Sequence, residues 1–520
     1  MKSLEFRMKT KGNITVNCHD LVLIETKKNV VSSNPSMSLN RRELIVNVSF
    51  LILANVLIKP YYIFFVERTI QNEVGTAAWG IYFTLFSLSM LPQIILDMGL
   101  TSFVNQKLSA QRDQFDELWG KTIWIKPILA VLFGVVFFII SWIFGYADKY
   151  PDLLGWIMVN QILLSGILFF RAFVSGLGYY RYDSFLSVAD KLIFIILFTL
   201  GVIIVKISSI QSFLWIQTIS LSIPLVITFI GLWRSKGIHI LLKPMEVFSE
   251  KTVQILGQCL PYAGIFILMV LFCRMEPVWI DLLRSDGPVQ SGIYAAAYRL
   301  LDAANMMGFL FAGILLPMFS HTIAREDARE YQSIFELAGS IMVSLAILIS
   351  FTILSQHRYI MNLLYKDSLP DILPVVIINL VPLTINYLLS TFLTAAGKAR
   401  IMNQYFLFSI GINVLCHILF TAKYGATGAA YSALITQTVT TIILSYLIHK
   451  TGLIRFTFSQ FIKLVGSFAI LIFLTILVDF LDVHPIIKLS ILFATSTLIF
   501  IGLGILPVRS VLSLFDRHRS

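Results

Sequence analysis

Charged residues are scarce in this chain of 520 residues: Asp, Glu, Lys and Arg make up 13% of it, and hydrophobic residues make up 57%. A soluble chain of this length needs far more polar side chains to cover its surface, so a soluble fold is excluded. The acidic residues are the scarcer of the charged ones, 29 against 40 Lys and Arg. No segment combines dense Lys and Arg with exposed aromatic residues, and we therefore expect no nucleic-acid partner.

Cysteine is also rare, with four in the chain: Cys18, Cys259, Cys273 and Cys416. They form no CxxC pair and no Cys/His spacing of a metal site, so we expect reduced cysteines, no metal and no cofactor. The phosphate-binding sequence GxxxxGK[ST] is missing, and no loop has room for a nucleotide-binding domain, which argues against ATP-driven pumping by this chain alone. The one long polar segment, residues 1–40, lacks a secretory apolar region. It is expected to be a cytoplasmic tail, or the product of a start codon assigned too early.

What the chain has in abundance is long apolar stretches, each of about 20 residues, the length at which a helix crosses a hydrocarbon core of about 30 Å. Fourteen of them occur, at 44–66, 78–98, 123–145, 153–175, 186–206, 213–233, 257–280, 291–316, 334–356, 371–393, 403–422, 427–448, 460–480 and 485–506. The pattern predicts an all-α membrane protein with about 14 transmembrane helices.

Basic residues are concentrated in alternate loops. One set of loops holds Arg41, Arg42, Lys107, Arg112, Lys121, Arg181, Arg234, Lys236, Arg325, Arg329, Lys398, Arg400, Lys450 and Arg455. Because cytoplasmic loops carry the excess of Lys and Arg, both termini are predicted to lie in the cytoplasm. The opposite loops are all short, which argues against a membrane enzyme such as a polysaccharide polymerase, since such an enzyme needs a large external loop.

A weak internal repeat divides the chain. Gly80-Ile81-Tyr82 enters the second span, and Gly292-Ile293-Tyr294 enters the eighth. Six crossings return the chain to its starting side, so two copies would run in the same direction, with a substrate path between them. We expect an N-lobe of spans 1–6 at 41–235 and a C-lobe of spans 7–12 at 236–450, around a central cavity. Residues 451–520 would add a helix pair and a cytoplasmic C-terminus.

Three groups of motifs suggest a family. The first comprises Glu73-Val74-Gly75, Gly80-Ile81-Tyr82 and Leu96-Asp97-Met98-Gly99-Leu100, the second runs from Ser291 to Leu300 with Leu316-Pro317 after it, and the third comprises Ala395-Ala396-Gly397-Lys398 and Tyr424-Gly425-Ala426-Thr427-Gly428. In this order they resemble the polysaccharide-transport branch of the MOP superfamily, the lipid-linked oligosaccharide flippases of O-antigen and capsule assembly. The tail before Arg41 departs from that family's usual chain.

The resemblance implies a bacterial cytoplasmic-membrane flippase rather than an enzyme. It would move undecaprenyl-pyrophosphate-linked repeat units from the inner to the outer leaflet by alternating access. The implied partners are that lipid-linked oligosaccharide, membrane lipids and glycan polymerase machinery. Two alternatives stay open: a cation-coupled multidrug exporter of the related branch, and a lipid II flippase.

Three cations inside the spans are the candidate substrate-binding residues: Lys59, Arg274 and Arg299. Each lies about 6–7 Å to the outer side of its span centre, counting 1.5 Å per residue. Charges inside a membrane normally face a cavity or a partner, and a cationic layer would suit a pyrophosphate. The alternative for Lys59 is snorkelling to the interface, and for Arg274 it is a structural ion pair with Glu276 or Asp281.

Three acids are the candidate coupling or gating residues: Asp302, Glu276 and Asp97. Asp302 is the deepest acid and follows Arg299 by three residues, so both lie on one helical face. It would be a proton or cation coupling group, or a static partner of Arg299. Asp97, near the cytoplasmic end of the second span, would belong to an inner gate together with Arg171, Asp190 and Lys191, or would be an interface anchor.

Overall fold

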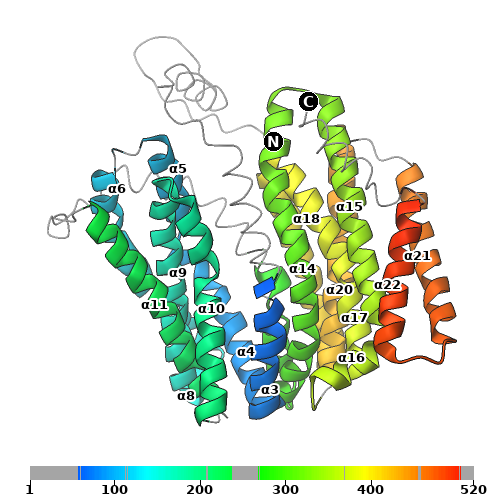
Figure 1. Cartoon of the computed structure of the whole chain (residues 1–520), viewed down its shortest axis with the longest axis horizontal. Helices are drawn as coiled ribbons and strands as arrows, with labels where there is room; N and C mark the ends of the chain where they lie inside the picture. Colours follow the sequence, from blue (N-terminus) through cyan, green and yellow to red (C-terminus); the bar gives the residue numbers. More distant parts are fainter. Residues whose placement is uncertain are drawn as a thin grey trace. The chain divides into compact units, whose positions relative to one another are not determined.

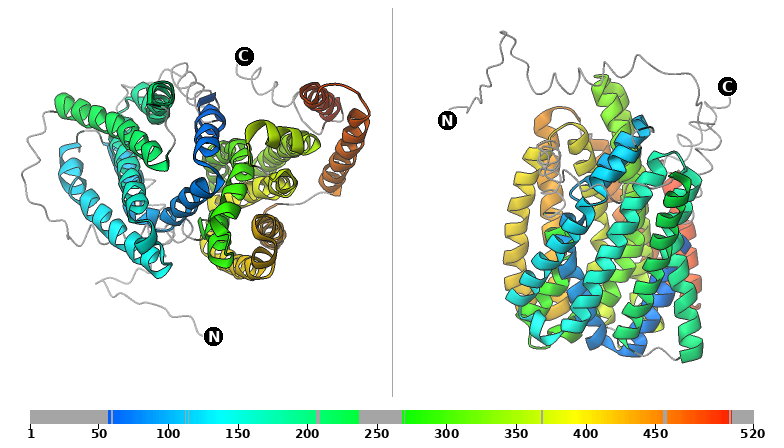
Figure 2. Two further views of the ribbon diagram at one scale, coloured as in Figure 1. Left: turned by 90° about the horizontal axis from the view of Figure 1, so that it is seen from below. Right: turned by 90° about the vertical axis from the view of Figure 1, so that its left-hand side faces the viewer.

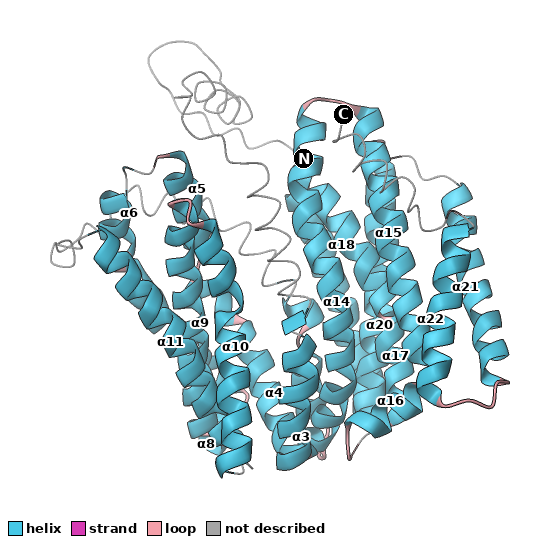
Figure 3. Cartoon of the chain, in the orientation of Figure 1, coloured by secondary structure: helices cyan, strands magenta, loops and turns pink. Residues whose placement is uncertain are grey.

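The computed structural model describes residues 57, 58, 60–111, 113, 115–205, 209–236, 268, 270–367, 369–454, 458–502 and 504. Within these ranges the secondary structure is entirely helical, as predicted (Figures 1 and 3). Lys59, the segment 1–40, most of the first predicted span and half of the seventh lie outside the described residues.

In the first predicted lobe, here called the N-lobe, the helices with defined bounds run from residue 62 to residue 236. Its elements are η1, a π-helix (Tyr62–Glu67), α3 (Arg68–Val74), α4 (Thr76–Met90), η2 (Pro92–Leu96), α5 (Leu100–Ala110), α6 (Phe115–Thr122), α7 (Ile125–Ile143), α8 (Tyr146–Lys149), α9 (Pro151–Gly176), α10 (Tyr180–Val205) and α11 (Ile210–Lys236). An aromatic cluster around the fully buried Trp119 and Phe173 packs α5, α6 and α9 together.

In the second lobe, the C-lobe, the helices with defined bounds run from residue 276 to residue 451, and Arg274 lies just before them. The C-lobe contains α13 (Glu276–Leu283), α14 (Gly287–Ala324), α15 (Ala328–Ser355), α16 (His357–Leu364), η5 (Pro370–Ile372), α17 (Leu373–Ile378), α18 (Leu380–Ala395), α19 (Ala399–Cys416), η6 (His417–Thr421) and α20 (Ala422–Thr451). The last two helices, α21 (Phe458–Asp479) and α22 (Pro485–Gly502), pack on each other and on α15 at the edge of this lobe (Figure 2).

The helices coincide with the predicted spans wherever the structure describes them. Nine helical runs in the described residues are long and apolar enough to cross a membrane, or ten when Thr76–Met90 and Pro92–Ser109 count as one bent span. One of the nine, Arg400–Thr451, covers two predicted spans, and it is interrupted where Gly425 leaves the helical conformation with φ 59° and ψ −131°. The count of fourteen stays a prediction.

The second predicted span is broken. Its two parts meet at an angle of 52°, because Pro92 interrupts the helix and Met98 and Gly99 both take a positive φ. The backbone carbonyl of Leu96 that this break leaves free accepts a hydrogen bond from Lys126 Nζ at 2.7 Å. Lys126 also donates to Ser165 Oγ at 2.7 Å. A largely buried lysine thereby supplies a hydrogen-bond donor to the carbonyl at the helix break inside the N-lobe.

The lobes meet along α4 and α14, at the glycines of the sequence repeat. A Cβ atom on Gly80 would lie 1.8 Å from the carbonyl oxygen of Pro288, and one on Gly292 would lie 2.0 Å from that of Thr76. The sequence separation between Gly80 and Gly292 equals that between Thr76 and Pro288, so each pair occupies equivalent positions in the two copies of the repeat. The contact is therefore reciprocal, as it is between two copies related by a two-fold axis.

Hydrogen bonds between the lobes gather at the end of the bundle that contains these glycines. Gln71 Nε2 donates to the Gly292 carbonyl at 3.1 Å, and Tyr146 Oη donates to Asp281 Oδ2 at 2.7 Å. Asn72 donates to the Leu364 carbonyl at 2.8 Å and accepts from the Lys366 backbone N–H at 3.1 Å. We call this end the junction end; here the lobes are held together by direct contacts.

Candidate functional site

The candidate site is built on α14, close to the contact between the lobes. Arg299 and Asp302 lie on one face of this helix, three residues apart, as the sequence predicts. Asn305 continues the same face and donates from Nδ2 to Tyr387 Oη at 3.2 Å. A long apolar helix thus carries a polar stripe at its middle, and this stripe faces other protein segments rather than lipid.

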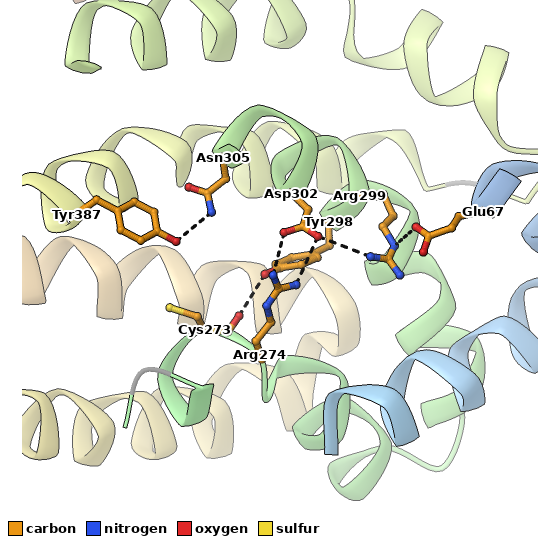
Figure 4. A network of polar contacts seen from close by, with 8 residues as sticks. All are labelled: Glu67, Cys273, Arg274, Tyr298, Arg299, Asp302, Asn305 and Tyr387. Atoms are coloured by element: carbon orange, nitrogen blue, oxygen red, sulfur yellow. Dashed lines mark hydrogen bonds and ion pairs between the residues drawn. The ribbon is translucent and has the colours of Figure 1, made fainter. Parts of the chain in front are cut away.

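Four charged side chains form a continuous row along that stripe (Figure 4). Arg274 Nη2 contacts Asp302 Oδ1 at 3.0 Å, and Arg299 Nη1 lies 3.6 Å from Asp302 Oδ2. On its other side Arg299 Nε lies 2.8 Å from Glu67 Oε2. Asp302 therefore bridges the two arginines, and Glu67, from the N-lobe, ends the row.

Aromatic rings line the two guanidinium groups. The Arg274 guanidinium lies 5.4 Å from the centre of the Tyr298 ring, and that of Arg299 lies 5.0 Å from the Phe83 ring. Tyr298 Oη donates to the Cys273 carbonyl at 3.2 Å, which fixes the ring beneath Arg274. Cation–π contacts in a desolvated setting hold both cations in place.

The row is balanced in charge, with two guanidinium groups and two carboxylates, but its two ends differ in exposure. The side chains of Arg299 and Glu67 are 7% exposed, whereas those of Arg274 and Asp302 are 29% and 19% exposed. A ligand approaching the row would reach Arg274 and Asp302 before it reached the buried pair.

The structure shows where most of the predicted site residues lie. Arg274 and Arg299 come together, through Asp302, whereas Lys59 lies outside the described residues. The alternative partners of Arg274 are engaged elsewhere or unbonded: Asp281 accepts a hydrogen bond from Tyr146, and the buried Glu276 has one carboxylate oxygen, Oε2, without a hydrogen-bond partner in the structure.

Sequence reasoning missed Glu67. It lies one residue beyond the predicted first span, so it was counted with the loop that follows. The π-helix η1 continues directly into α3 here, and Glu67 remains 6% exposed. The available signal was its position directly after an apolar run, on the side of the membrane where Arg274 and Arg299 were placed.

The residues predicted as an inner gate form separate pairs inside the N-lobe. Asp97 caps Thr101 and lies 3.8 Å from Lys126. Arg171 pairs with Asp183 at 2.7 Å, and Asp190 pairs with Lys191 at 3.3 Å. In this conformation the structure does not bring these residues together.

A second polar group lies at the junction end, outside the spans. Arg284 Nε donates to Asp286 Oδ1 at 2.8 Å, and Gln290 Nε2 donates to Asp286 Oδ2 at 2.9 Å. Gln290 Oε1 in turn accepts the Ala426 backbone N–H at 3.1 Å. The hydrogen bond from Arg284 lowers the pKa of Asp286 below its usual value. This group ties the start of α14 to the start of α20.

No group of three or more His, Cys, Asp or Glu side chains in the described part of the chain is arranged to hold a metal ion.

Comparison with known proteins adds a family and a fold. Residues 44–323 match the family model described as "Polysaccharide biosynthesis protein". No curated protein matches the chain.

Among solved structures, a multidrug resistance MATE transporter of the MOP superfamily, in its inward-facing conformation, is 13% identical, with a TM-score of 0.60 over 79% of this chain and 98% of that one. The lipid II flippase MurJ in an inward closed conformation is also 13% identical, with a TM-score of 0.59 over 88% and 98%. A mutant of the Vibrio cholerae MATE transporter VcmN is 15% identical, with a TM-score of 0.57 over 78% and 94%. At these identities the structures establish a shared fold.

Proposed function

The chain belongs to the polysaccharide biosynthesis protein family, and from this premise we propose that it is a flippase for undecaprenyl-pyrophosphate-linked oligosaccharides. It moves the repeat unit from the cytoplasmic to the outer leaflet of the bacterial cytoplasmic membrane, for O-antigen, capsule or exopolysaccharide assembly. The family match and the MOP-type fold support a transport role. The substrate and the direction of movement are the proposal.

One observation carries the proposal: a row of two arginines and two carboxylates at the contact between the lobes. Arg274 presents a planar guanidinium that binds Asp302 through two nitrogens, at 3.0 and 3.5 Å. The same fork matches two oxygens of a phosphate. In the proposed mechanism the pyrophosphate binds here, the sugars occupy the path between the lobes, and the polyprenyl chain stays in lipid.

The direction follows from the proposed topology, with both termini in the cytoplasm and the 281–290 loop outside. The junction end is then the outer end, and the hydrogen bonds of Asn72, Gln71 and Tyr146 seal it in this conformation. The lobes would separate there to release substrate. Labelling of single cysteines in the 281–290 and 357–370 loops tests this topology: reaction with an impermeant reagent added outside supports it, and labelling only from the cytoplasmic side rejects it.

The multidrug exporter is less well supported by the site. A hydrophobic cationic drug favours unpaired carboxylates, whereas each carboxylate in this row contacts at least one guanidinium. A lipid II flippase would carry the same pyrophosphate-linked polyprenyl group. The row therefore supports both flippases equally, and the two substrates differ in their sugar portion.

The direct test is complementation of a strain that lacks this protein's gene. Surface glycan restored by the wild-type chain, with growth and drug resistance unaffected by its loss, supports the repeat-unit flippase. Rescue of a strain depleted of its lipid II flippase would instead assign lipid II. A fall in drug resistance without loss of glycan would assign the exporter.

A further inference from the structure

Glu67 and Arg299 form a buried ion pair that joins the two lobes. Glu67 ends η1 in the N-lobe, and Arg299 lies in α14 of the C-lobe, with 2.8 Å between Oε2 and Nε. A second pair between the lobes, Lys366 with Glu73 at 3.8 Å, is largely exposed, at 69% and 49% of the two side chains. Removing one partner of a buried pair is strongly destabilising, whereas an exposed pair contributes little.

A carboxylate and a phosphate compete for the same guanidinium geometry. Both present two oxygens that accept parallel N–H bonds, and both are anions. Glu67 contacts Arg299 as an ion pair through one oxygen, 2.8 Å from Nε and outside hydrogen-bond geometry. It therefore neutralises Arg299 as an anionic headgroup would, without filling both donor positions of the guanidinium. The more exposed Arg274 and Asp302 adjoin this pair, so the headgroup would meet Arg274 first and Arg299 second.

We propose that Glu67 is an internal stand-in for the substrate pyrophosphate, and that substrate binding displaces it from Arg299 and so releases the lobes. This inference rests on the proposed function and deepens it. A bond between the lobes is exchanged for a bond between one lobe and the substrate. Binding of the correct headgroup thereby weakens the closed junction, as a ligand must do when it favours one of two conformations.

The N-lobe has a cation of its own for the displaced carboxylate. Lys191 on α10 lies with Nζ 4.8 Å from the centre of the Tyr62 ring, which belongs to η1 as Glu67 does. Its charge acts on Glu67, and it already pairs with Asp190 at 3.3 Å. Movement of Glu67 towards Lys191 would keep the carboxylate neutralised inside its own lobe after the exchange.

The backbone at Glu67 is also suited to such a movement. Residues 62–67 form a π-helix that passes without interruption into α3. Short π-turns of this kind are rare and are frequently found at functional sites. Converting the π-turn to α-helical pairing shifts the register by one residue, which turns the side chain at its end away from its former partner.

Binding to a sugar-free probe tests the exchange independently of glycan transport. The full-length protein in lipid nanodiscs is titrated with undecaprenyl pyrophosphate, and undecaprenol serves as the uncharged comparison. The variants are Glu67→Gln, Glu67→Asp, which keeps the charge, and Glu73→Gln, which removes the exposed partner of Lys366. We expect Glu67→Gln to bind the pyrophosphate about tenfold more tightly than wild type, because it removes one competitor for Arg299. Glu73→Gln should bind like wild type, and Glu67→Asp should bind with an affinity between those of wild type and Glu67→Gln, because its carboxylate is kept but shortened.

A distance measurement tests the release. Spin labels at Lys149→Cys and Lys423→Cys, in a variant whose native cysteines are serine and which still binds the probe, report the separation of the lobes at the junction end. Pyrophosphate should lengthen this distance in the wild-type background, and Glu67→Gln should show the longer distance without ligand. Should Glu67→Gln fail to fold, the same titration of Glu67→Asp decides, since a shortened carboxylate should hold the lobes closed less tightly and open at lower ligand concentration.

The outcomes separate the two claims. Binding of pyrophosphate by wild type, with unchanged or weaker binding and an unchanged distance in Glu67→Gln, rejects the exchange and leaves the proposed function standing. No binding of the pyrophosphate above that of undecaprenol by either protein rejects both.

Discussion

Replacing Gly292 by alanine should force the two lobes apart at the junction end. A Cβ atom at this position would lie 2.0 Å from the Thr76 carbonyl oxygen and 2.8 Å from its carbonyl carbon, where ordinary contacts begin near 3.4 Å. Both atoms belong to backbone, so no side-chain rotation relieves the clash. The α4 and α14 helices would have to separate by roughly 1.4 Å, and overpacking of this kind costs about 1–3 kcal/mol.

The matched control is Gly155→Ala in α9. Its Cβ atom would have no neighbour within 4 Å, and alanine is favoured over glycine inside a helix by about 1 kcal/mol. Thermal unfolding of both variants in detergent, followed by tryptophan fluorescence, should give a lower melting temperature for Gly292→Ala and an equal or higher one for Gly155→Ala.

A second measurement makes the prediction specific to the junction. Cysteines placed at this end should react faster with an impermeant reagent in Gly292→Ala than in wild type. A Gly292→Ala protein with the wild-type melting temperature and wild-type reactivity would refute the argument that the repeat glycines set the distance between the lobes.

The positions of the spans could be predicted from the sequence because a helix that crosses the lipid needs an uninterrupted apolar run of about 20 residues. The pair of Arg299 and Asp302 could be predicted for a similar reason, since their spacing alone places them on one face. Partners on different helices could not be predicted this way. Periodicity does not say how a helix is rotated against its neighbour. The alternative to a substrate-binding role for Arg274 therefore named only the acids near it in sequence, Glu276 and Asp281, whereas it pairs with Asp302.

Glu67 and Lys126 show the same limit. Each lies near the end of a predicted span, where an ionisable residue is ordinarily an interfacial anchor. Only the contact of Glu67 with Arg299 on α14, and the break at Pro92 in the second span, give these two side chains partners inside the protein.

Three further variants test other parts of the account. Asp302→Asn removes the carboxylate shared by both arginines and should lower the melting temperature, by less than the loss of a fully buried pair, because Arg274 is 29% exposed and Arg299 keeps Glu67; unchanged pH dependence of transport together with that drop would reject a coupling role for Asp302. Lys126→Met removes the stronger of two hydrogen bonds to the Leu96 carbonyl, leaving that from Ser165 Oγ at 3.3 Å, and should destabilise the N-lobe by about 1.5–3 kcal/mol, visible as faster hydrogen exchange after the helix break; exchange as slow as in wild type would contradict this. Asp286→Asn should lose a small stabilisation, because the pKa of this acid is lowered by Arg284 in the folded state. That stabilisation is present above the unfolded pKa of about 4 and disappears as the pH falls through the lower folded value, so the difference in melting temperature from wild type should vanish in acid; a difference that grows in acid would overturn the assignment.

The central claim is that the arginine row binds the headgroup that is carried across the membrane. Arg274 is the decisive position, because it is more exposed than Arg299 and its loss leaves Glu67 paired. The measurement is flipping of a fluorescent undecaprenyl-pyrophosphate-linked oligosaccharide in proteoliposomes by wild type, Arg274→Gln and the control Arg284→Gln, at equal amounts of folded protein. The account predicts that Arg274→Gln flips at least about tenfold more slowly, the equivalent of one lost charge-assisted contact of about 1.4 kcal/mol, and that Arg284→Gln flips like wild type. Flipping by Arg274→Gln at the wild-type rate would contradict it.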